Sequence, residues 1–525
     1  MTLKVSFAMS IYLPVYIGSL VLALVMTPVV TRLSHRFGIV HAPGVRHIHT
    51  RPMSHIGGVA IFLAMMSITI AALYFPNIAG VDRSAMPREL GILLLAACFV
   101  FITGLVDDIK TRGLRARTKF IAQIAVALAL CAAGIRIESV AVTDSLTLNF
   151  GWLSWPLTLL WIVGITNAVN LIDGLDGLAA GISAVACGVI AVFAASQGQA
   201  AIVVLMLALL GSICGFLFFN FNPATIFMGD CGSMFLGFTI ASSSVLCSTQ
   251  SAALAGLALP ALALSVPILD TLFSMLRRFL ERRSIFSADR SHFHHRLIDA
   301  GFTQRRAVLT IYGLTLLAAG TGMFMMIVPK AYALIPLFAA LLPLFAAFRA
   351  AGSIRLKDVK TALKKRYGLI HQEHEDRKSF EDAALYFRRA TTFDQWWLAA
   401  STAADKMDFL TMELPLINRD GTARALTWQH NGDGLHFGRE GLIQVHLPVR
   451  DRRSGSSLFL RIEVHKNGSL EAAGRRVALF TRLIEEHDIV NLSAHRREER
   501  PVEGRRNDSL LIRYDVRRPS AGPEQ

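Results

Sequence analysis

Cysteine is scarce in this sequence. The chain has 525 residues and six cysteines, and none follows Cys247. Secreted domains held together by disulfides are rich in cysteine, so nothing indicates such a domain in the second half of the chain. No two cysteines lie at the spacing of metal ligands, and most are interpreted as buried free thiols. No signal-peptide cleavage site follows the apolar run that ends at Val30, so this run is interpreted as a first membrane helix.

Polar residues are also fewer than in a soluble protein. Hydrophobic residues make up 53% of the chain, and the mean hydropathy is +0.47. The formal net charge is +15, which in a soluble protein would suggest a nucleic-acid partner. In a membrane protein, basic residues instead collect in cytoplasmic loops. We therefore predict no nucleic-acid partner and ask where along the chain the positive charge lies.

Long apolar segments recur through the first two thirds of the chain. A spanning helix needs ~20 mostly apolar residues. Eleven stretches reach or approach this length: roughly 11–31, 57–76, 90–106, 119–137, 153–169, 178–195, 199–219, 235–248, 254–276, 307–328 and 331–349. We predict an all-α polytopic membrane protein of about 11 transmembrane helices, with a C-terminal soluble α+β domain.

Basic residues are unevenly distributed between the connections. The segments after the first, third and ninth stretches are rich in arginine and lysine, with eight arginines between Arg277 and Arg306. The segments after the even-numbered stretches hold only Arg83, Arg88 and Lys330. The positive-inside rule therefore places the N-terminus outside, and the odd-numbered loops and the C-terminal tail in the cytoplasm. The predicted location is the inner (cytoplasmic) membrane.

The character of the sequence changes after the membrane domain of residues 1–350. Residues 351–400 are charged and compatible with a helical linker. Within residues 401–525, "FLTMELPLI", "LIQVHLPV" and "LFLRIEV" alternate like half-buried strands, and "GRRVALFTRLIEEH" has the pattern of an amphipathic helix. We predict a cytoplasmic α+β domain with a flexible end. Its role is unknown, because we find no catalytic motif in it.

Five polar regions lie in the odd-numbered loops or at the helix ends beside them. In chain order they contain "RHIHTRPMSHIGG", "GLVDDIKTRGLRARTK", "NAVNLIDGLDGLAAG", "NFNPATIFMGDCGS", and "PILDTLFSMLRR" followed by "RRSIFSADRSHFHHRL". One face of the membrane thereby collects the aspartates Asp107, Asp108, Asp173, Asp176, Asp230 and Asp270. Ionisable residues near membrane spans are costly and usually mark function.

Carboxylates and cations in one basin indicate phosphoryl transfer. Carboxylate and amide oxygens hold Mg²⁺, arginine and histidine bind phosphate oxygens, and glycine lets the backbone approach a ligand. An acidic residue can take a proton from a nucleophile. A basin at the membrane surface suits a lipid phosphate and a soluble diphosphate as substrates. A zinc site at "HFHH" is the alternative, but Arg290 and Arg296 beside it favour an anion.

Together these motifs resemble those of the polyprenyl-phosphate N-acetylhexosamine-1-phosphate transferases, over roughly residues 10–350. "DDIK", "NAVNLIDGLDGLAAG", "FMGDCGS", "PILDT" and "SADRSHFHHRL" occur in the order typical of that family. The resemblance implies an eleven-helix fold with a cytoplasmic active site and Mg²⁺, or Mn²⁺, as the cofactor. The implied reaction moves a sugar 1-phosphate from a UDP-sugar to undecaprenyl phosphate, releases UMP, and initiates a cell-surface polysaccharide.

The resemblance also implies roles for individual residues. Asp230 would be the metal ligand, with Asn170 beside the metal. Asp107 would be the base for the lipid phosphate, with Asp108 as its neighbour, and Asp173 and Asp176 would belong to the nucleotide pocket. These last four form the catalytic set. The substrate-binding set is Asn167, Asn170, His292, His294, His295, Arg290, His49 and Lys119.

Several alternatives remain open. "DRSHFHHRL" resembles the branch that starts O-antigen, teichoic-acid or exopolysaccharide chains, usually from UDP-GlcNAc. The peptidoglycan branch, which uses UDP-MurNAc-pentapeptide, tends to carry three consecutive histidines. A transporter would instead place ionisable residues near the bilayer midplane in both halves of a repeat. A membrane-anchored sensor or scaffold would not need six carboxylates in the membrane basin. A homodimer is left open.

Overall fold

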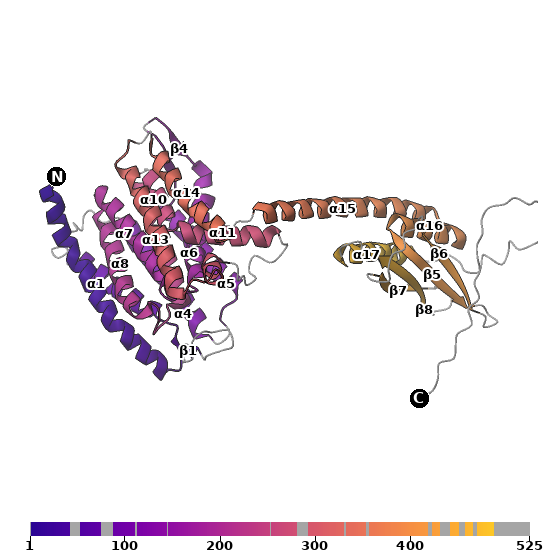
Figure 1. Cartoon of the computed structure of the whole chain (residues 1–525), viewed down its shortest axis with the longest axis horizontal. Coiled ribbons are helices and arrows are strands. Elements are labelled where there is room, and N and C mark those ends of the chain that lie inside the picture. The colour runs from indigo at the N-terminus through magenta and orange to yellow at the C-terminus, as the bar shows by residue number, and fades with distance from the viewer. Residues whose placement is uncertain are drawn as a thin grey trace, which may run out of the picture. The chain divides into compact units, whose positions relative to one another are not determined.

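The computed structural model describes residues 2–41, 53–74, 88–110, 113–143, 145–251, 254–280, 292–329, 332–352, 356–417, 423–430, 442–450, 457–465 and 470–487. The chain divides into two compact units, Met1–Val359 and Lys360–Gln525. Each unit has its own hydrophobic core. Figure 1 labels helices and strands of both units.

The first unit is almost entirely helical. Its helices are α1 (Thr2–Arg36), α2 (Gly58–Tyr74), α4 (Arg88–Ile109), α5 (Ala116–Ala132), α6 (Ser154–Ile172), α7 (Leu178–Ser196), α8 (Ala200–Asn220), α9 (Gly229–Ser251), α10 (Leu254–Ala263), α11 (Ser265–Leu280), α12 (Phe293–Asp299), α13 (Gln304–Met323) and α14 (Leu334–Ala350). Two short antiparallel pairs join them: β1 (Val40–His41) with β2 (Met53–Ser54), and β3 (Ser139–Ala141) with β4 (Thr147–Asn149).

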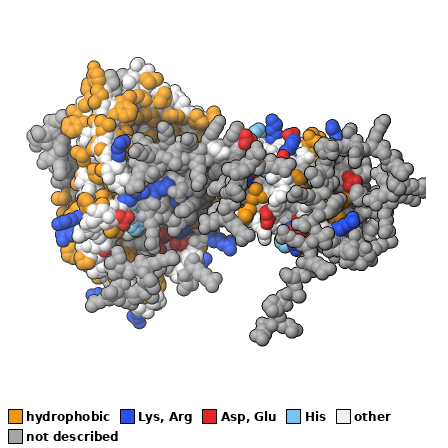
Figure 2. Space-filling model, turned by 45° about the vertical axis from the view of Figure 1, so that its right-hand side comes forward, with side chains coloured by type: hydrophobic (Ala, Val, Ile, Leu, Met, Phe, Trp, Pro, Cys, Tyr) orange, Lys and Arg blue, Asp and Glu red, His pale blue; other side chains and the backbone are white. Residues whose placement is uncertain are grey.

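Many of these helices could cross a membrane. Among the described residues, seven are long and apolar enough, namely those that correspond to α1, α4, α6, α7, α8, α9 and α13. The bent pair α10–α11 could be an eighth, and α2 and α14 are shorter apolar helices. Apolar side chains gather over the upper and left-hand part of this unit (Figure 2). A mostly helical, multi-pass membrane architecture is thereby confirmed, whereas the predicted number of about eleven spans is not established.

The structure differs from the prediction at the ninth apolar stretch, residues 254–276. We predicted one continuous span, but α10 and α11 meet at a bend of 75°. The local reason is Pro267, in the first turn of α11. Proline has no backbone N–H and therefore cannot donate to the carbonyl of Ala263, four residues earlier, so a straight helix cannot continue through this point.

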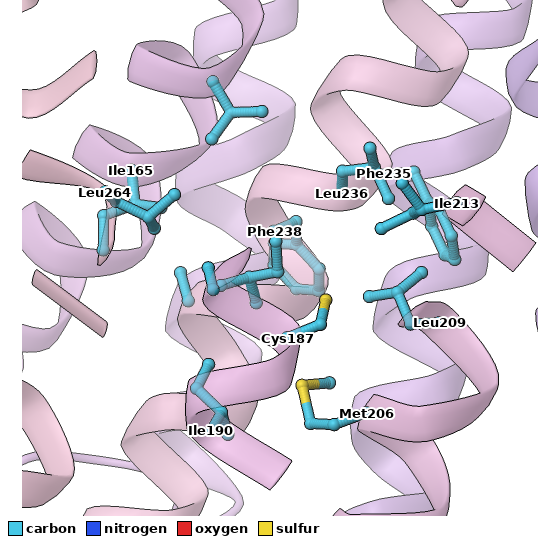
Figure 3. Packing of buried hydrophobic residues seen from close by; sticks show 14 of the residues in the cluster. Ile165, Cys187, Ile190, Met206, Leu209, Ile213, Phe235, Leu236, Phe238 and Leu264 are labelled. Carbon is cyan, nitrogen blue, oxygen red and sulfur yellow. The ribbon is translucent and has the colours of Figure 1, made fainter. Parts of the chain in front are cut away.

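Helix α9 forms the centre of the first unit. The apolar window of its span is completely buried, and it packs against α2, α4, α6, α7 and α10. Phe235, Leu236 and Phe238 of α9 lie among the buried side chains of neighbouring helices such as Cys187 and Ile213 (Figure 3). Because Asp230 lies in the first turn of this helix, the packing of the core determines where that carboxylate is held.

Glycines allow two helices to approach the start of α9 very closely. A Cβ atom on Gly104 of α4 would lie 2.6 Å from the carbonyl oxygen of Asp230 and 2.6 Å from Cα of Cys231. A Cβ on Gly58 of α2 would lie 2.2 Å from the backbone nitrogen of Gly232. Both contacts are with backbone, which cannot rotate away. These glycines therefore bring the ends of α2 and α4 against the helix that carries Asp230.

The second unit combines helices with an antiparallel sheet. Its elements are α15 (Leu356–Arg389), α16 (Phe393–Lys406), β5 (Phe409–Ile417), β6 (Ala423–Gln429), β7 (Leu442–Arg450), β8 (Ser457–His465) and α17 (Leu470–Glu486), with the strand order β6-β5-β8-β7. The alternating residues Met412 and Leu414 of β5, and Leu460 and Ile462 of β8, are buried in one core. The strands predicted from this alternation are thus present.

This second core begins before residue 401, the predicted start of the soluble domain. Trp396 of α16 is 1% exposed, and Phe387, near the end of α15, is 3% exposed. Both side chains belong to the same core as the sheet. The predicted boundary therefore falls inside α16, because the periodicity of a charged helix does not reveal which unit its few apolar residues pack against. The predicted strand at "SLLIRYDV" lies outside the described residues.

The contact between α4 and α9 leads to a first prediction. Gly104→Ala should lower the melting temperature of the detergent-purified protein, because overpacking a tight backbone contact costs ~1–3 kcal/mol. It should also reduce the activity proposed below, because the start of α9 must shift. Gly91→Ala is the matched control on the same helix, since a Cβ there meets nothing within 4 Å. Equal melting temperatures for the two variants would contradict this account.

Candidate active site

Three aspartates from two helices form an acidic cluster. Asp107 and Asp108 lie near the C-terminal end of α4, and Asp230 lies in the first turn of α9. One carboxylate oxygen of each lies within 4.8 Å of the others, close enough for a single metal ion. Among the described residues, this is the one such group found. Asp230, the predicted metal ligand, thus lies beside Asp107, the predicted base, and its neighbour Asp108. In the sequence, 122 positions separate Asp108 from Asp230.

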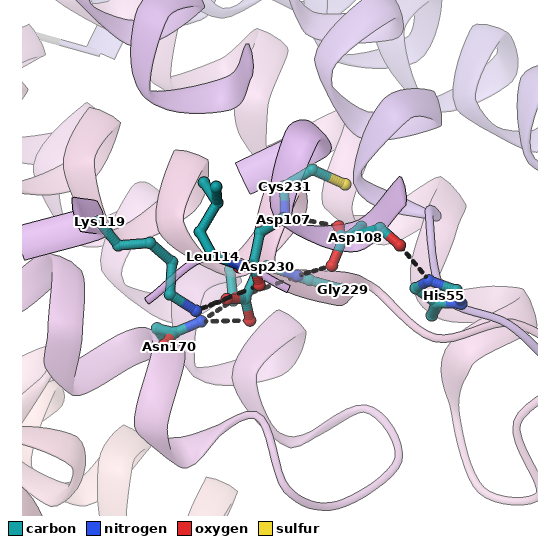
Figure 4. A network of polar contacts seen from close by, with 10 residues as sticks. His55, Asp107, Asp108, Leu114, Lys119, Asn170, Gly229, Asp230 and Cys231 are labelled. Carbon is teal, nitrogen blue, oxygen red and sulfur yellow. Dashed lines mark hydrogen bonds and ion pairs between the residues drawn. The ribbon is translucent and has the colours of Figure 1, made fainter. Parts of the chain in front are cut away.

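Asp108 joins α4 to α9. Its two carboxylate oxygens accept the backbone N–H groups of Asp230 and Cys231, each at 2.9 Å (Figure 4). The first N–H groups of a helix have no partner within the helix, and they favour a negative charge. His55 contacts the backbone carbonyl of Asp108 at 2.7 Å and so ties the segment before α2 to the same point. Asp108 therefore positions the cluster as well as adding charge to it.

Lys119 of α5 lies between the other two carboxylates. Its Nζ is 2.6 Å from Oδ2 of Asp230 and 3.2 Å from Oδ2 of Asp107. Asn170, near the end of α6, donates from Nδ2 to Oδ1 of Asp230 at 2.9 Å and to Ser233 at 2.9 Å. The side chains of Asp107, Lys119 and Asp230 are 13%, 23% and 26% exposed, so a ligand can reach them. The carboxylates outnumber the ammonium group, which leaves a net negative charge that suits a divalent cation.

The turn between α6 and α7 is held by a second network. Asp176 is 4% exposed, and its Oδ2 accepts from Nδ2 of Asn222 at 3.0 Å and from the backbone N–H of Ala224 at 3.1 Å. Gly177, at φ +79°, donates to Asn220 and accepts from the hydroxyl of Tyr312 in α13. Asp176 therefore fastens this turn to the loop after α8.

Asp173 lies at the start of the same turn. It caps the C-terminal end of α6 and is half-buried. Burial is the main cause that raises its pKa to about 7, and the negative charges of Asp230, Asp108 and Asp176 raise it further. The Asp173 carboxylate thus belongs electrostatically to the acidic cluster, and it is the member that most readily holds a proton near neutral pH.

The predicted histidines lie at the start of α12. His292 is its N-cap, and His294 and His295 follow in the first turn. His294 is 2% exposed, and burial lowers its pKa to about 3, so its imidazole is neutral. A Cβ on Gly174 would lie only 2.9 Å from Nε2 of His294, which shows how closely this ring approaches the turn between α6 and α7. Among the described residues, none of the three histidines belongs to the group of carboxylates that could hold a metal ion.

The other predicted residues are placed differently. Asn167 lies one turn before Asn170, and its side-chain nitrogen contacts Gln123 of α5 and the backbone carbonyl of Val163. These contacts join α5 to α6 beside the acidic cluster. His49 and Arg290 lie outside the described residues. Tyr312 and Gln123, which hold the site from α13 and α5, were missed because each lies in an apolar stretch of its helix without a motif around it.

Comparison with known proteins agrees with this geometry. Residues 90–248 match the family described as "Glycosyl transferase family 4". The "Probable undecaprenyl-phosphate N-acetylglucosaminyl 1-phosphate transferase" of Bacillus subtilis is 42% identical over 301 residues, which cover 57% of this chain and 80% of the relative. The chain belongs to glycosyl transferase family 4. The resemblance predicted from the motifs is thereby confirmed.

Two further relatives are less similar to this chain. The "Decaprenyl-phosphate N-acetylglucosaminephosphotransferase" of Mycobacterium leprae is 34% identical, over 54% of this chain and 76% of that protein. The "Phospho-N-acetylmuramoyl-pentapeptide-transferase" of Halalkalibacterium halodurans is 29% identical, over 59% of this chain and 94% of that protein. The family match itself covers the acidic cluster and the turn between α6 and α7, and ends before the histidines of α12.

The raised pKa of Asp173 leads to a second prediction. Above pH 7 its carboxylate is ionised in the folded state, at a cost set by burial and by neighbouring carboxylates. The unfolded chain ionises near pH 4, so this cost grows as the pH rises from ~4 to ~7. Asp173→Asn removes it and should raise the melting temperature more at pH 8 than at pH 5, in detergent with a chelator present. A gain that is equal at both pH values would contradict this account.

Proposed function

We propose that this chain transfers N-acetylglucosamine 1-phosphate from UDP-N-acetylglucosamine to undecaprenyl phosphate and releases UMP. The observation that carries the proposal is the meeting of Asp107, Asp108 and Asp230 beside the turn that holds Asp173. Carboxylates and amides at one end of a helix bundle suit the binding of a metal and a diphosphate. The name of the 42% identical relative supports N-acetylglucosamine as the sugar.

Transfer of phospho-N-acetylmuramoyl-pentapeptide is the second candidate. Its support is the relative of that name, which is 29% identical to this chain. Two observations favour the first candidate. The N-acetylglucosaminyl relative is 42% identical to this chain and the pentapeptide relative 29%. The sequence "SHFHH" also stands in place of three consecutive histidines. Transfer assays of the purified protein with UDP-N-acetylglucosamine and with UDP-MurNAc-pentapeptide distinguish the two candidates.

The residues of the acidic cluster fit a magnesium ion. Asp107 and Asp230 would hold it, Asp108 would keep α9 in place, and the amide of Asn170 lies against Asp230. Bound Mg²⁺ would neutralise charge on the diphosphate of the donor. Mn²⁺ would satisfy the same oxygen ligands. Lys119 already contacts two of these carboxylates and would keep the remaining negative charge partly balanced.

In the direct form of the reaction, an oxygen of the lipid phosphate attacks the phosphorus that carries the sugar. A new phosphorus–oxygen bond forms there, and the bond to the bridging oxygen of the diphosphate breaks. UMP leaves with that oxygen. Asp107 would accept the proton of the lipid phosphate if it binds as a monoanion, since its carboxylate is partly exposed and close to Lys119. Catalysis would then consist mainly of positioning and charge neutralisation.

The metal proposal gives a third prediction. Asp230→Ala should lower turnover by orders of magnitude, measured as transfer of radiolabel from UDP-N-acetylglucosamine to undecaprenyl phosphate across a Mg²⁺ titration. The protein should still insert and purify. Glu138→Gln is the control, because Glu138 is an exposed carboxylate of the same unit, paired with Arg136. Near-normal turnover of Asp230→Ala at limiting Mg²⁺ would remove Asp230 from the metal site.

We further propose that the active site and the second unit face the cytoplasm at the inner membrane, as the distribution of basic residues predicts. The membrane unit would carry out the whole reaction, and the second unit would tune it or recruit a partner. The separate cores of the two units support this division.

A truncation after Gly352 tests that division and is the fourth prediction. It keeps the bond between Nη1 of Arg296 and the carbonyl of Gly352, 2.6 Å long, which joins the segment after the histidines to the end of α14. The truncated protein should retain transfer activity with soluble donor and lipid phosphate in detergent. A truncated protein that is folded, as judged by its melting temperature, yet inactive would show that the second unit contributes to the reaction.

A further inference from the structure

Helix α11 has its polar face inside the protein and its apolar face outside. Its side chains Asp270, Ser274 and Arg278, four positions apart, are 4%, 2% and 7% exposed. The opposite face carries exposed large apolar residues: Leu272, Met275, Leu276 and Phe279. In a bilayer the outward apolar face meets lipid, while polar residues that face inward are costly and mark function. Asp270 is the acidic residue on that inward face, and the mechanism above does not use it.

Asp270 is fully engaged with the start of α12. Its Oδ2 lies 2.9 Å from Nδ1 of His292, and its Oδ1 accepts the backbone N–H of Phe293 at 2.8 Å. His292 is itself only 6% exposed. A buried carboxylate without partners would be strongly unfavourable, whereas here each oxygen has one. One carboxylate therefore holds both the ring of His292 and the first turn of the helix that carries all three histidines.

The contact with Asp270 determines which nitrogen of His292 is available. A carboxylate accepts and does not donate, so Nδ1 of His292 carries a hydrogen, and Nε2 is left to contact a ligand. With Nδ1 bonded to Asp270, His292 meets a ligand through Nε2.

His294 has the opposite character. Its ring lies parallel to that of His292, with 5.7 Å between centroids, and it packs against Gly174 of the turn between α6 and α7. Its Nδ1 is buried and has no hydrogen-bond partner among the described residues. Because the pKa of His294 is lowered to about 3, this ring is a neutral spacer between His292 and that turn.

We propose that Asp270 is a positioning residue of the transfer reaction, which fixes the tautomer and orientation of His292 so that Nε2 of His292 contacts the diphosphate or the sugar of the donor. This inference rests on the proposed function of the same site. It assigns the two buried histidines different tasks: His292 acts on the donor, and His294 transmits its position to the turn that holds Asp173 and Asp176.

A double-mutant cycle tests the inference. Asp270→Asn keeps an acceptor for the N–H of Phe293 but offers His292 an amide, which favours the other tautomer. In the wild-type background it should lower kcat ~10–100-fold, the loss found when the carboxylate partner of a metal-bound histidine is removed, while the KM for UDP-N-acetylglucosamine changes less. In the His292→Ala background the same substitution should change kcat less than ~2-fold, because the imidazole through which Asp270 acts is absent. Leu272→Ala, on the exposed face of α11, is the control and should leave activity unchanged.

Two outcomes would overturn the inference. One is an equal fall of kcat on Asp270→Asn in both backgrounds, which would mean that Asp270 acts through the fold and not through His292. The other comes from ¹⁵N solid-state NMR of histidine-labelled protein, which reports the tautomer without any turnover. The His292→Ala variant identifies the signals of His292. If these signals are the same in wild type and in Asp270→Asn, Asp270 does not set the tautomer.

Failure of the proposed function would look different. Wild-type protein would then not transfer N-acetylglucosamine 1-phosphate at all, although the NMR result for His292 would still hold. If the protein transfers phospho-N-acetylmuramoyl-pentapeptide instead, the cycle is repeated with that donor, and the same coupling between Asp270 and His292 is expected.

Discussion

The bond between the carboxylate of Asp108 and the start of α9 organises the whole site. Two backbone N–H groups at a helix start would be unsatisfied inside a membrane protein, and Asp108 accepts both at 2.9 Å. Since one donor is the N–H of Asp230 itself, this contact fixes the carboxylate of Asp230 relative to Asp107. The close approach requires glycine at Gly104 and a left-handed backbone at Gly229, with φ +74°. Packing and chemistry therefore depend on the same few residues.

The membrane reverses the usual distribution of polarity around this centre. Helix α9 is buried over its entire apolar window yet contains the run Ser242, Ser243 and Ser244, all fully or nearly fully buried. Helix α11 likewise keeps Asp270 inside and Leu272 outside. In a bilayer the outer surface gains nothing from charge, so polar side chains are retained where they hold helices together or bind substrate. The inward polar face of a helix is thus a direct guide to function here.

Motifs predicted the acidic cluster, and periodicity predicted most helices and the strands of the second unit. Contacts within one turn or one loop were harder to predict. Asp176 was expected in the nucleotide pocket, but its carboxylate also fastens the loop with Asn222, which depends on how two connections meet. The bend between α10 and α11 depends on one missing N–H at Pro267 within an otherwise continuous apolar run. Hydropathy averages over such a run and cannot detect a single lost hydrogen bond.

The charge balance of the site constrains its chemistry further. The carboxylates of Asp107, Asp108 and Asp230 lie close enough together to hold one metal ion. Burial, and then the charges of Asp230, Asp108 and Asp176, raise the pKa of Asp173 to about 7. Among the described cations, Lys119 contacts Asp107 and Asp230. The second buried histidine adds no charge, since the pKa of His294 is about 3. A donor diphosphate and a lipid phosphate are both anions, and they would meet repulsion from this basin. Transfer between them therefore requires added positive charge, which supports the proposal of a divalent cation held by Asp107 and Asp230.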